Sequence, residues 1–483
     1  MSKKEIFIYY ISIVLFFILI YIIEPLIKNY IRSITVGSII LIIGGFYVAK
    51  RIKKLKINYK NIILIIMIVG ILTRAMYIIY TPITERQHDV YGINDQGHLG
   101  YIYTIYQTGK LPDTNSIQFY HPPLFHLIAA GWLKINDMFN VNLDRSIEGI
   151  QIITAIFSTL IMLVSYRIIE KIKIKNIYEV FIMAVMAFHP TFIILAGSIN
   201  NDVLMILLSF YIILYLMEWN DNPSIKNTIV LAVITGCSVM TKISGAIMAV
   251  PIMYTFIKKI IETYKIEKNR LLDLFGKFIM FGIISLPLGL WHPIRKLILF
   301  NQPLGGVLLP GDGLYVGQYS MVQRFLSISF KELFGQLYCV IPDDHNIFAY
   351  IVKCSILGEF TYSNIIAIYV TLFKIINFII ILITIVCIFI LLKKIRKINN
   401  NSFITKILLI TFFTNIVSYY NFNIKYPYVC TMDFRYIVPT IFTGIVTVCM
   451  VLDEYIKNDI IKEIIEYTIT LFCILSLVLF FII

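Results

Sequence analysis

The stretch NIILIIMIVGILTRAMYIIYTPITERQHDVYGINDQGH, residues 61–98, joins an apolar segment directly to a densely polar one. Arg74 is the one charged residue in its first part, 61–80, which is long enough for a helix that crosses a bilayer. The ionisable residues of the part that follows are Glu85, Arg86, His88, Asp89, Asp95 and His98. This order predicts a membrane protein whose polar chemistry lies at one face of the bilayer.

The composition of the whole chain agrees with this interpretation. Of the 483 residues, 59% are apolar and 14% are charged, and the mean hydropathy is +0.82. Soluble domains are about 45–50% apolar and about 25% charged, so a soluble enzyme, a disordered protein and a nucleic-acid module are excluded. The seven cysteines have no CxxC spacing, and we expect them to be small apolar core residues.

Segments of about 20 mostly apolar residues mark candidate membrane spans. Thirteen such segments are predicted, which indicates an all-α, polytopic membrane helical bundle. They lie near residues 6–23, 34–49, 61–80, 147–168, 177–196, 201–217, 227–241, 243–257, 272–291, 364–392, 403–420, 435–452 and 465–483.

The basic runs between these spans predict the orientation. Four basic runs fall on one side of the membrane if there are thirteen crossings: 50–60, 167–175, 258–270 and 393–397. The lysines and arginines of such runs also account for the net charge of +14. We therefore expect a multi-pass cell-membrane protein with a cytoplasmic N-terminus. The C-terminus and the two long segments at 81–146 and 292–363 then lie outside.

This topology requires that residues 122–136 do not span. The stretch is short and starts with Pro122-Pro123, so we expect a helix at the outer interface or dipping into it. The expected organisation is two extra N-terminal spans in 1–60, a membrane domain in 61–452 and a C-terminal span in 453–483.

All seven histidines fall at or near the predicted outer face, and the cytoplasmic loops contain none. Carboxylates beside apolar walls, as in 84–98, suit a general base or a metal site, although a hydrated loop has the same composition. His121 stands before a rigid Pro-Pro helix start. His121 and His126 form only a weak zinc pattern, because no cysteine or close carboxylate completes it.

Three further polar positions lie at the predicted outer ends of spans. Asp202, in the segment Ser198 to Asp202, is either a helix N-cap or a second carboxylate that faces the site. Arg435 suits bidentate contact with a phosphate, or it extends to lipid headgroups. Lys242 is another phosphate candidate, whereas Arg74 lies within a span and must find a partner there.

These motifs, in this order, resemble the glycosyltransferase C superfamily, and in particular its family 39 branch. That branch includes protein O-mannosyltransferases and lipid A aminoarabinose transferases. The resemblance extends over residues 61–450. The segments that carry it are Gln87 to Val90, Gly109 to Pro112, Tyr120 to Leu124, Asn200 to Asp202, Gly236 to Pro251 with Thr241-Lys242, Trp291 to Pro303 and Phe434 to Pro439.

Two features depart from the family pattern. The usual acidic motif is Asp-Glu, whereas this chain has Asp89-Val90 and Asp95-Gln96, and two spans precede the helix that resembles the family's first. The resemblance implies sugar transfer from a polyprenyl-phosphate donor to an acceptor at the outer face, where the acceptor is a protein, a lipid or a glycan. Membrane lipid is the other partner; neither a nucleotide sugar nor a nucleic acid is expected.

The resemblance also implies roles for individual residues. Asp89 is the preferred general base, with Asp95 as the alternative and Asp202 as the second acidic position. Arg435, Lys242 or Arg295 would stabilise the departing lipid phosphate. The remaining expected substrate-binding residues are His88, His98, Tyr120, His121, Asn201 and Tyr436.

No cofactor is expected. A divalent metal between Asp89 and Asp202 is the less favoured option, because the family 39 branch generally acts without one. Two other functions are compatible with the composition. A transporter or flippase of lipid-linked sugars would place ionisable groups near the bilayer midplane and show an internal repeat. A non-catalytic membrane scaffold would leave the ordered outer motifs unexplained.

Overall fold

The structure is a computed structural model that describes residues 3–53, 58–309, 311–341, 343–363, 365–394 and 402–483. The described part of the chain is a bundle of helices without a β-strand. Its longer helices are α1 (Lys3–Ile27), α2 (Ile31–Lys53), α3 (Tyr59–Tyr80), α7 (Ile150–Ile169), α8 (Asn176–Phe188), α10 (Asp202–Asp221), α11 (Ile225–Thr241), α12 (Ala249–Ile266), α13 (Leu271–Phe300), α16 (Ala367–Lys394), α17 (Ser402–Lys425), α18 (Pro439–Glu454) and α19 (Asp459–Ile482). The shorter ones are α4 (His98–Thr108), α5 (Leu124–Met138), α6 (Leu143–Glu148), α9 (Pro190–Gly197), α14 (Phe330–Phe334) and α15 (Ile347–Leu357).

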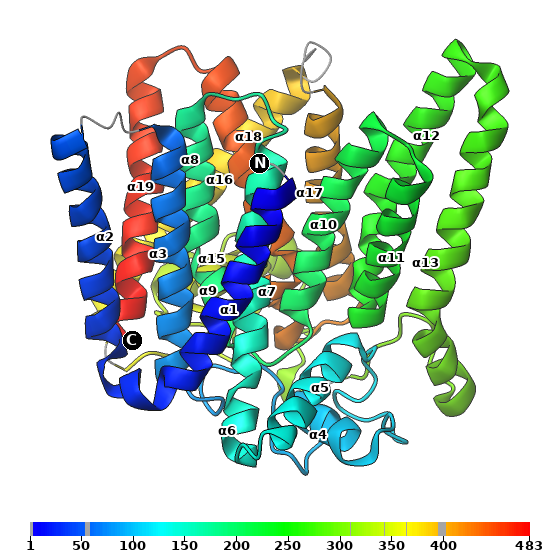
Figure 1. Ribbon diagram of the computed structural model, residues 1–483, viewed down its shortest axis with the longest axis horizontal. Coiled ribbons are helices and arrows are strands. Elements are labelled where there is room, and N and C mark those ends of the chain that lie inside the picture. Colours follow the sequence, from blue (N-terminus) through cyan, green and yellow to red (C-terminus); the bar gives the residue numbers. More distant parts are fainter. Residues whose placement is uncertain (1–2, 54–57, 310, 342, 364, 395–401) are drawn as a thin grey trace.

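The expected all-α membrane bundle is confirmed, but the count of thirteen spans is not. Ten stretches of the described residues are long and apolar enough to cross a membrane, or eleven if the bent pair Val429–Ile437 and Pro439–Glu454 is one span. One reason for the difference is that Lys4–Val48 is a single helical stretch of 45 residues where two spans were predicted. Figure 1 shows α1 and α2 as two rods that meet at the short turn Lys28–Tyr30. The other reason is α11, which has only 17 residues.

The two ends of the bundle differ in character. Helices α4, α5 and α6 lie together at one end, whereas α12 and α13 are joined at the opposite end, where the N-terminus also lies (Figure 1). The basic runs at 167–175 and 258–270 therefore fall at the end opposite α4–α6. Those at 50–60 and 393–397 lie partly outside the described residues. These two basic runs and the polar segment that carries α4 and α5 thus lie at opposite ends of the bundle, and which end faces outward stays a prediction.

The non-spanning helix that was expected at 122–136 is confirmed. It is α5, which begins at Leu124 directly after Pro122-Pro123 and is absent from the stretches that could cross a membrane. Its buried face, which includes Phe125, His126 and Leu133, packs inward. The helix therefore covers the end of the bundle rather than crossing it (Figure 1).

The histidines are not all at one face. His189 lies within the candidate span Asn176–Gly197, at a break between α8 and α9. Proline at position 190 has no amide hydrogen, so the helix cannot continue its hydrogen-bond ladder there. The break frees the carbonyl groups of Met186, Ala187 and Phe188 in the interior of the bundle.

Arg74 on α3 supplies the missing donors. Its Nη1 donates to the Ala187 carbonyl at 2.8 Å and its Nη2 to the Met186 carbonyl at 3.2 Å. Its Nε donates to the Ser158 hydroxyl of α7 at 2.9 Å. The hydroxyl of Ser476 donates to the Phe188 carbonyl. The expected partner of Arg74 is thus a set of backbone carbonyls, and the fully buried guanidinium ties three helices together.

We predict that Arg74→Met lowers the free energy of unfolding by roughly 3 kcal/mol or more, because it leaves several buried carbonyls without a donor. Arg74→Lys should be intermediate, because a single ammonium group cannot reach all the acceptors. The measurement is the apparent melting temperature in detergent. Lys60→Met, which removes an exposed cation from the same helix, serves as the control. A melting temperature of Arg74→Met equal to that of this control would contradict the assigned role.

Candidate functional site

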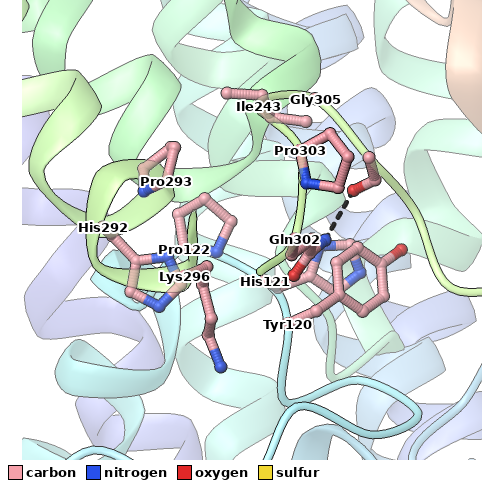
Figure 2. Close-up of a pocket in the computed structure, with 11 residues that line it drawn as sticks. Tyr120, His121, Pro122, Ile243, His292, Pro293, Lys296, Gln302, Pro303 and Gly305 are labelled. Atoms are coloured by element: carbon pink, nitrogen blue, oxygen red, sulfur yellow. Dashed lines mark hydrogen bonds between the residues drawn. The ribbon is translucent and has the colours of Figure 1, made fainter. Parts of the chain in front are cut away.

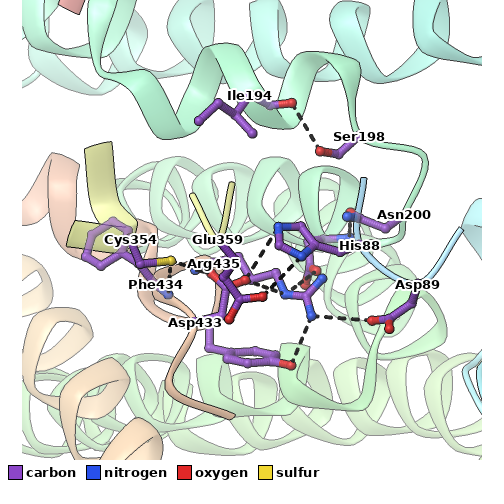
Figure 3. Close-up of polar contacts among 12 residues, drawn as sticks. His88, Asp89, Ile194, Ser198, Asn200, Cys354, Glu359, Asp433, Phe434 and Arg435 are labelled. Atoms are coloured by element: carbon purple, nitrogen blue, oxygen red, sulfur yellow. Dashed lines mark hydrogen bonds and ion pairs between the residues drawn. The ribbon is translucent and has the colours of Figure 1, made fainter. Parts of the chain in front are cut away.

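The centre of the candidate site is the guanidinium of Arg435. Arg435 lies in a short helical turn, Phe434–Ile437, just before α18, and it is 7% exposed. Its Nε is 3.2 Å from Oδ2 of Asp433 and 3.8 Å from Oδ2 of Asp202, while its Nη2 is 3.5 Å from Oδ2 of Asp89. One cation therefore gathers carboxylates from three distant parts of the chain (Figure 3).

A second cation, Lys242, approaches the same carboxylates from the junction after α11. Its ammonium forms an ion pair with Oδ1 of Asp202 and lies 4.8 Å from the ring centre of Tyr436. Burial lowers the pKa of Lys242 below its usual value, and the nearby Asp202 carboxylate opposes this effect. Lys242 and Arg435 thus hold Asp202 from two sides.

Asp202 is the first residue of α10 rather than its N-cap. The cap position belongs to Asn201, whose side chain makes no capping hydrogen bond and instead donates to the Thr241 carbonyl at 3.0 Å. Asn201 therefore fixes the Lys242 segment against the start of α10. Of the two alternatives for Asp202, the structure agrees with a carboxylate that faces the site.

His88 lies between two more carboxylates. Its Nδ1 is 3.4 Å from Oε2 of Glu359, and its Nε2 is 3.6 Å from Oδ2 of Asp433. Neither Glu359 nor Asp433 was among the residues predicted for the site from the sequence. Nothing in the sequence distinguishes Glu359 from the other acidic residues of 292–363, because its role arises only when the loop after α15 folds onto His88.

The loop that carries His88 and Asp89 has an unusual backbone. Arg86, Asp89 and Tyr91 have φ angles of 53°, 57° and 51°, in the left-handed region. Each such residue costs roughly 1–2 kcal/mol. The loop is held by the Asp89 carbonyl, which accepts from the His98 amide at 2.9 Å.

The side chain of Gln87 also fixes this loop in place. It donates to the Gly197 carbonyl at 2.7 Å and accepts from the Ile199 amide at 2.9 Å. Both partners belong to the junction between α9 and α10, so the loop is fixed to the segment that also presents Asp202. The strain is thus tolerated in a loop that directs Asp89 toward Arg435.

Asp95 belongs to the same loop but lies elsewhere. It is exposed, and its Oδ2 accepts from the Gly92 amide at 2.8 Å, as in a turn. Asp89 is the carboxylate that contacts Arg435, and its side chain is 36% exposed. The structure therefore brings Asp89, and not Asp95, into the cluster with Asp202.

His98, His121 and His126 form a buried group beside the site. Nδ1 of His98 is 2.9 Å from Nε2 of His126, and the rings of His98 and His121 are stacked at 5.6 Å. The ring of His126 stacks on Tyr101 at 4.0 Å. Burial lowers the pKa of each histidine well below its usual value, and Lys242 adds to the effect for His98 and His121. These rings pack α4, α5 and the preceding loop together.

A hollow next to this group is lined by Tyr120, His121, the C-terminal part of α13 and the segment that follows it (Figure 2). His292 and Lys296 come from α13, and Gln302 comes from the segment after it. Arg295, the expected phosphate contact, donates to the Pro112 carbonyl at 3.3 Å, while the neighbouring Lys296 lines the hollow. A helical segment presents adjacent residues in different directions, which the sequence pattern could not assign.

Residues 96–400 match the family described as "Predicted membrane protein (DUF2142)". The chain belongs to the DUF2142 family. The match covers Asp202, Lys242 and Glu359, whereas His88, Asp89, Asp433 and Arg435 lie beyond its two ends. The site of this DUF2142 protein is thus completed by segments on either side of the matched region.

Comparison with curated proteins and with solved structures gives little further information. No curated protein matches the chain. Among solved structures, apo ArnT from Cupriavidus metallidurans is similar over 86% of this chain and 77% of its own, with 10% identity and a TM-score of 0.36. A likeness at this level supports no argument about function, which therefore rests on the site itself.

We predict that acidification destabilises the DUF2142 protein through its buried histidines. Each histidine that stays neutral when folded and ionises when unfolded lowers the unfolding free energy by about 1.4 kcal/mol per pH unit below about 6.5. The melting temperature should therefore fall between pH 7.5 and 5.5. His126→Gln removes one such group and should make the fall smaller. A wild-type melting temperature that stays constant over this range would contradict the prediction.

Proposed function

We propose that this DUF2142 protein is an integral membrane glycosyltransferase. It moves a sugar from a polyprenyl-phosphate donor to an acceptor at the outer face of the cell membrane. The observation that carries the proposal is the convergence of Asp89, Asp202, Asp433, Lys242 and Arg435 at one buried point. The family 39 resemblance of the sequence motifs supplies the donor class.

Asp89 is the best placed general base. Asp202 is buried and engaged by both cations, and Asp433 accepts from the Arg435 amide at 2.8 Å through Oδ1. Asp89 makes a single ion pair, 3.5 Å to Arg435, and its side chain is the most accessible of the three. An acceptor hydroxyl can therefore reach its free oxygen within hydrogen-bond distance, which a general base requires.

The reaction follows from these positions. The acceptor oxygen attacks the anomeric carbon of the sugar and gives its proton to the Asp89 carboxylate. The bond between that carbon and the lipid phosphate oxygen breaks, and its electron pair leaves with the phosphate. Arg435 and Lys242 are the cations beside this point, and they would stabilise the charge that develops on the phosphate.

Other residues shape the surroundings. Tyr436 presents its ring to Lys242, and Tyr120 and His121 line the neighbouring hollow. We place the donor's head in this region, with its tail in the membrane. The acceptor is a protein, a lipid or a glycan, and it would approach over α4 and α5.

The test is donor consumption by purified protein. A panel of polyprenyl-phosphate sugars is supplied with membrane extract as acceptor, and free polyprenyl phosphate is measured by mass spectrometry. We expect Asp89→Asn to lose at least about 100-fold in rate, because it removes the base. Asp95→Asn should keep most of the activity, because Asp95 lies in an exposed turn.

Near-normal turnover by folded Asp89→Asn would contradict the role of Asp89. Loss of activity in Asp95→Asn alone would transfer that role to Asp95. If the folded wild type releases no polyprenyl phosphate from any donor, transfer itself is contradicted. Movement of an unchanged lipid-linked sugar between leaflets would then support the transporter alternative.

We also predict the sidedness of the site. Asp113 lies in the polar segment between α4 and α5, and Lys268 lies in the turn between α12 and α13; both are exposed. In intact cells a membrane-impermeant maleimide should label Asp113→Cys, whereas Lys268→Cys should react only after permeabilisation. The wild-type chain measures the background of native thiols. The opposite labelling pattern would place the site on the cytoplasmic side.

A further inference from the structure

We propose that His88, Glu359 and Asp433 bind one divalent metal ion. Each residue offers one ligand atom, and these atoms lie within 4.8 Å of one another. Figure 3 shows the three side chains directed toward a common space beside Arg435. An imidazole with two carboxylates is a ligand set that suits Mn²⁺ or Zn²⁺. This differs from the expectation of no metal, and from an ion between Asp89 and Asp202.

The two carboxylates are oriented as metal ligands usually are, with one oxygen hydrogen-bonded to the protein and the other held only by ion-pair contacts. Oε1 of Glu359 accepts from the Tyr350 hydroxyl, which leaves Oε2 toward His88. Oδ1 of Asp433 accepts from the Arg435 amide at 2.8 Å and from the Cys354 thiol at 3.2 Å. Its other oxygen, Oδ2, therefore faces the same space as Oε2 of Glu359.

Oδ2 of Asp433 is the independent observation that points to a ligand. Asp433 is 3% exposed, and this buried oxygen has no hydrogen bond of good geometry; its neighbours are Nε of Arg435 at 3.2 Å and Nε2 of His88 at 3.6 Å. Buried acceptors are normally hydrogen-bonded, and leaving one without a hydrogen bond is costly. A cation coordinated by this oxygen would satisfy it.

The balance of charge supports a cation here. Four carboxylates, Asp89, Asp202, Glu359 and Asp433, share the region with two fixed cations, Lys242 and Arg435. Unbalanced negative charge is costly where water is largely excluded. If the proposed function holds, an anionic lipid phosphate would worsen the imbalance, whereas a divalent ion would correct it.

The three ligand atoms lie within 4.8 Å of one another, so they must move closer together to hold an ion. Ligands about 2.1 Å from a tetrahedral ion stand about 3.4 Å from one another. The two nitrogens of His88 are 3.4 Å and 3.6 Å from the two carboxylates. Because each nitrogen now faces a different carboxylate, binding needs a small rotation that directs one nitrogen toward both.

The test measures metal binding without substrate, so it does not depend on transfer activity. Purified protein is stripped with a chelator, dialysed and titrated with Mn²⁺, and binding is followed by electron paramagnetic resonance. We expect one tightly bound equivalent, with nitrogen modulation of the Mn²⁺ signal from His88. Glu359→Gln should weaken binding at least tenfold, and His88→Gln should remove the nitrogen modulation.

Glu85→Gln is the matched control, because Glu85 is an exposed acid of the same loop whose partner is Arg86. It should bind Mn²⁺ like the wild type. The proposal is overturned if the wild type binds no stoichiometric Mn²⁺, or if Glu359→Gln and His88→Gln bind it unchanged. The first result would indicate that His88 bridges the two carboxylates directly, without an ion. Binding of Mn²⁺ without sugar transfer would uphold the metal site and contradict the proposed function separately.

Discussion

A buried guanidinium surrounded by carboxylates is the constraint on which this structure depends. Arg435 cannot give up its charge, so the fold must supply opposite charges wherever it places this side chain. It does so with Asp89 from the loop after α3, Asp202 from the start of α10 and Asp433 from its own turn. These segments are far apart in sequence, and the need to pair one cation brings them to one point.

Arg74 is also a buried cation that needs partners, but its partners differ in kind from those of Arg435. Its partners are backbone carbonyls that the α8–α9 break sets free. Its Nε, Nη1 and Nη2 all donate to groups of the fold. Arg435 is surrounded by ionised groups whose pairing a ligand can change. Burial alone therefore does not distinguish a functional arginine from a structural one. The chemical nature of the groups that pair with its guanidinium does.

The spans, the interfacial helix and several site residues could be predicted from the sequence, because each depends on local pattern. Apolar length determines a span, and Pro122-Pro123 determines where α5 begins. The predicted number of spans was wrong where the apolar pattern does not show how a long stretch divides into spans, as in the 45-residue stretch Lys4–Val48. Asp89, Asp202, Lys242 and Arg435 were expected near one another because each ends or follows a span at the same face.

Glu359, the role of Asp433 and the position of Lys296 could not be predicted in this way. Each acquires its role from a contact with a distant segment: Glu359 with His88, Asp433 with Cys354 and Lys296 with the Thr114 carbonyl. A contact between distant segments also explains why Asp89 is the most exposed carboxylate around Arg435. The left-handed backbone of its loop directs it toward Arg435 from the open side, while the buried carboxylates are already engaged. In the proposed reaction one acid accepts a proton while the others stay paired with the fixed cations. The strained loop provides this difference, because it leaves Asp89 more exposed than the buried acids.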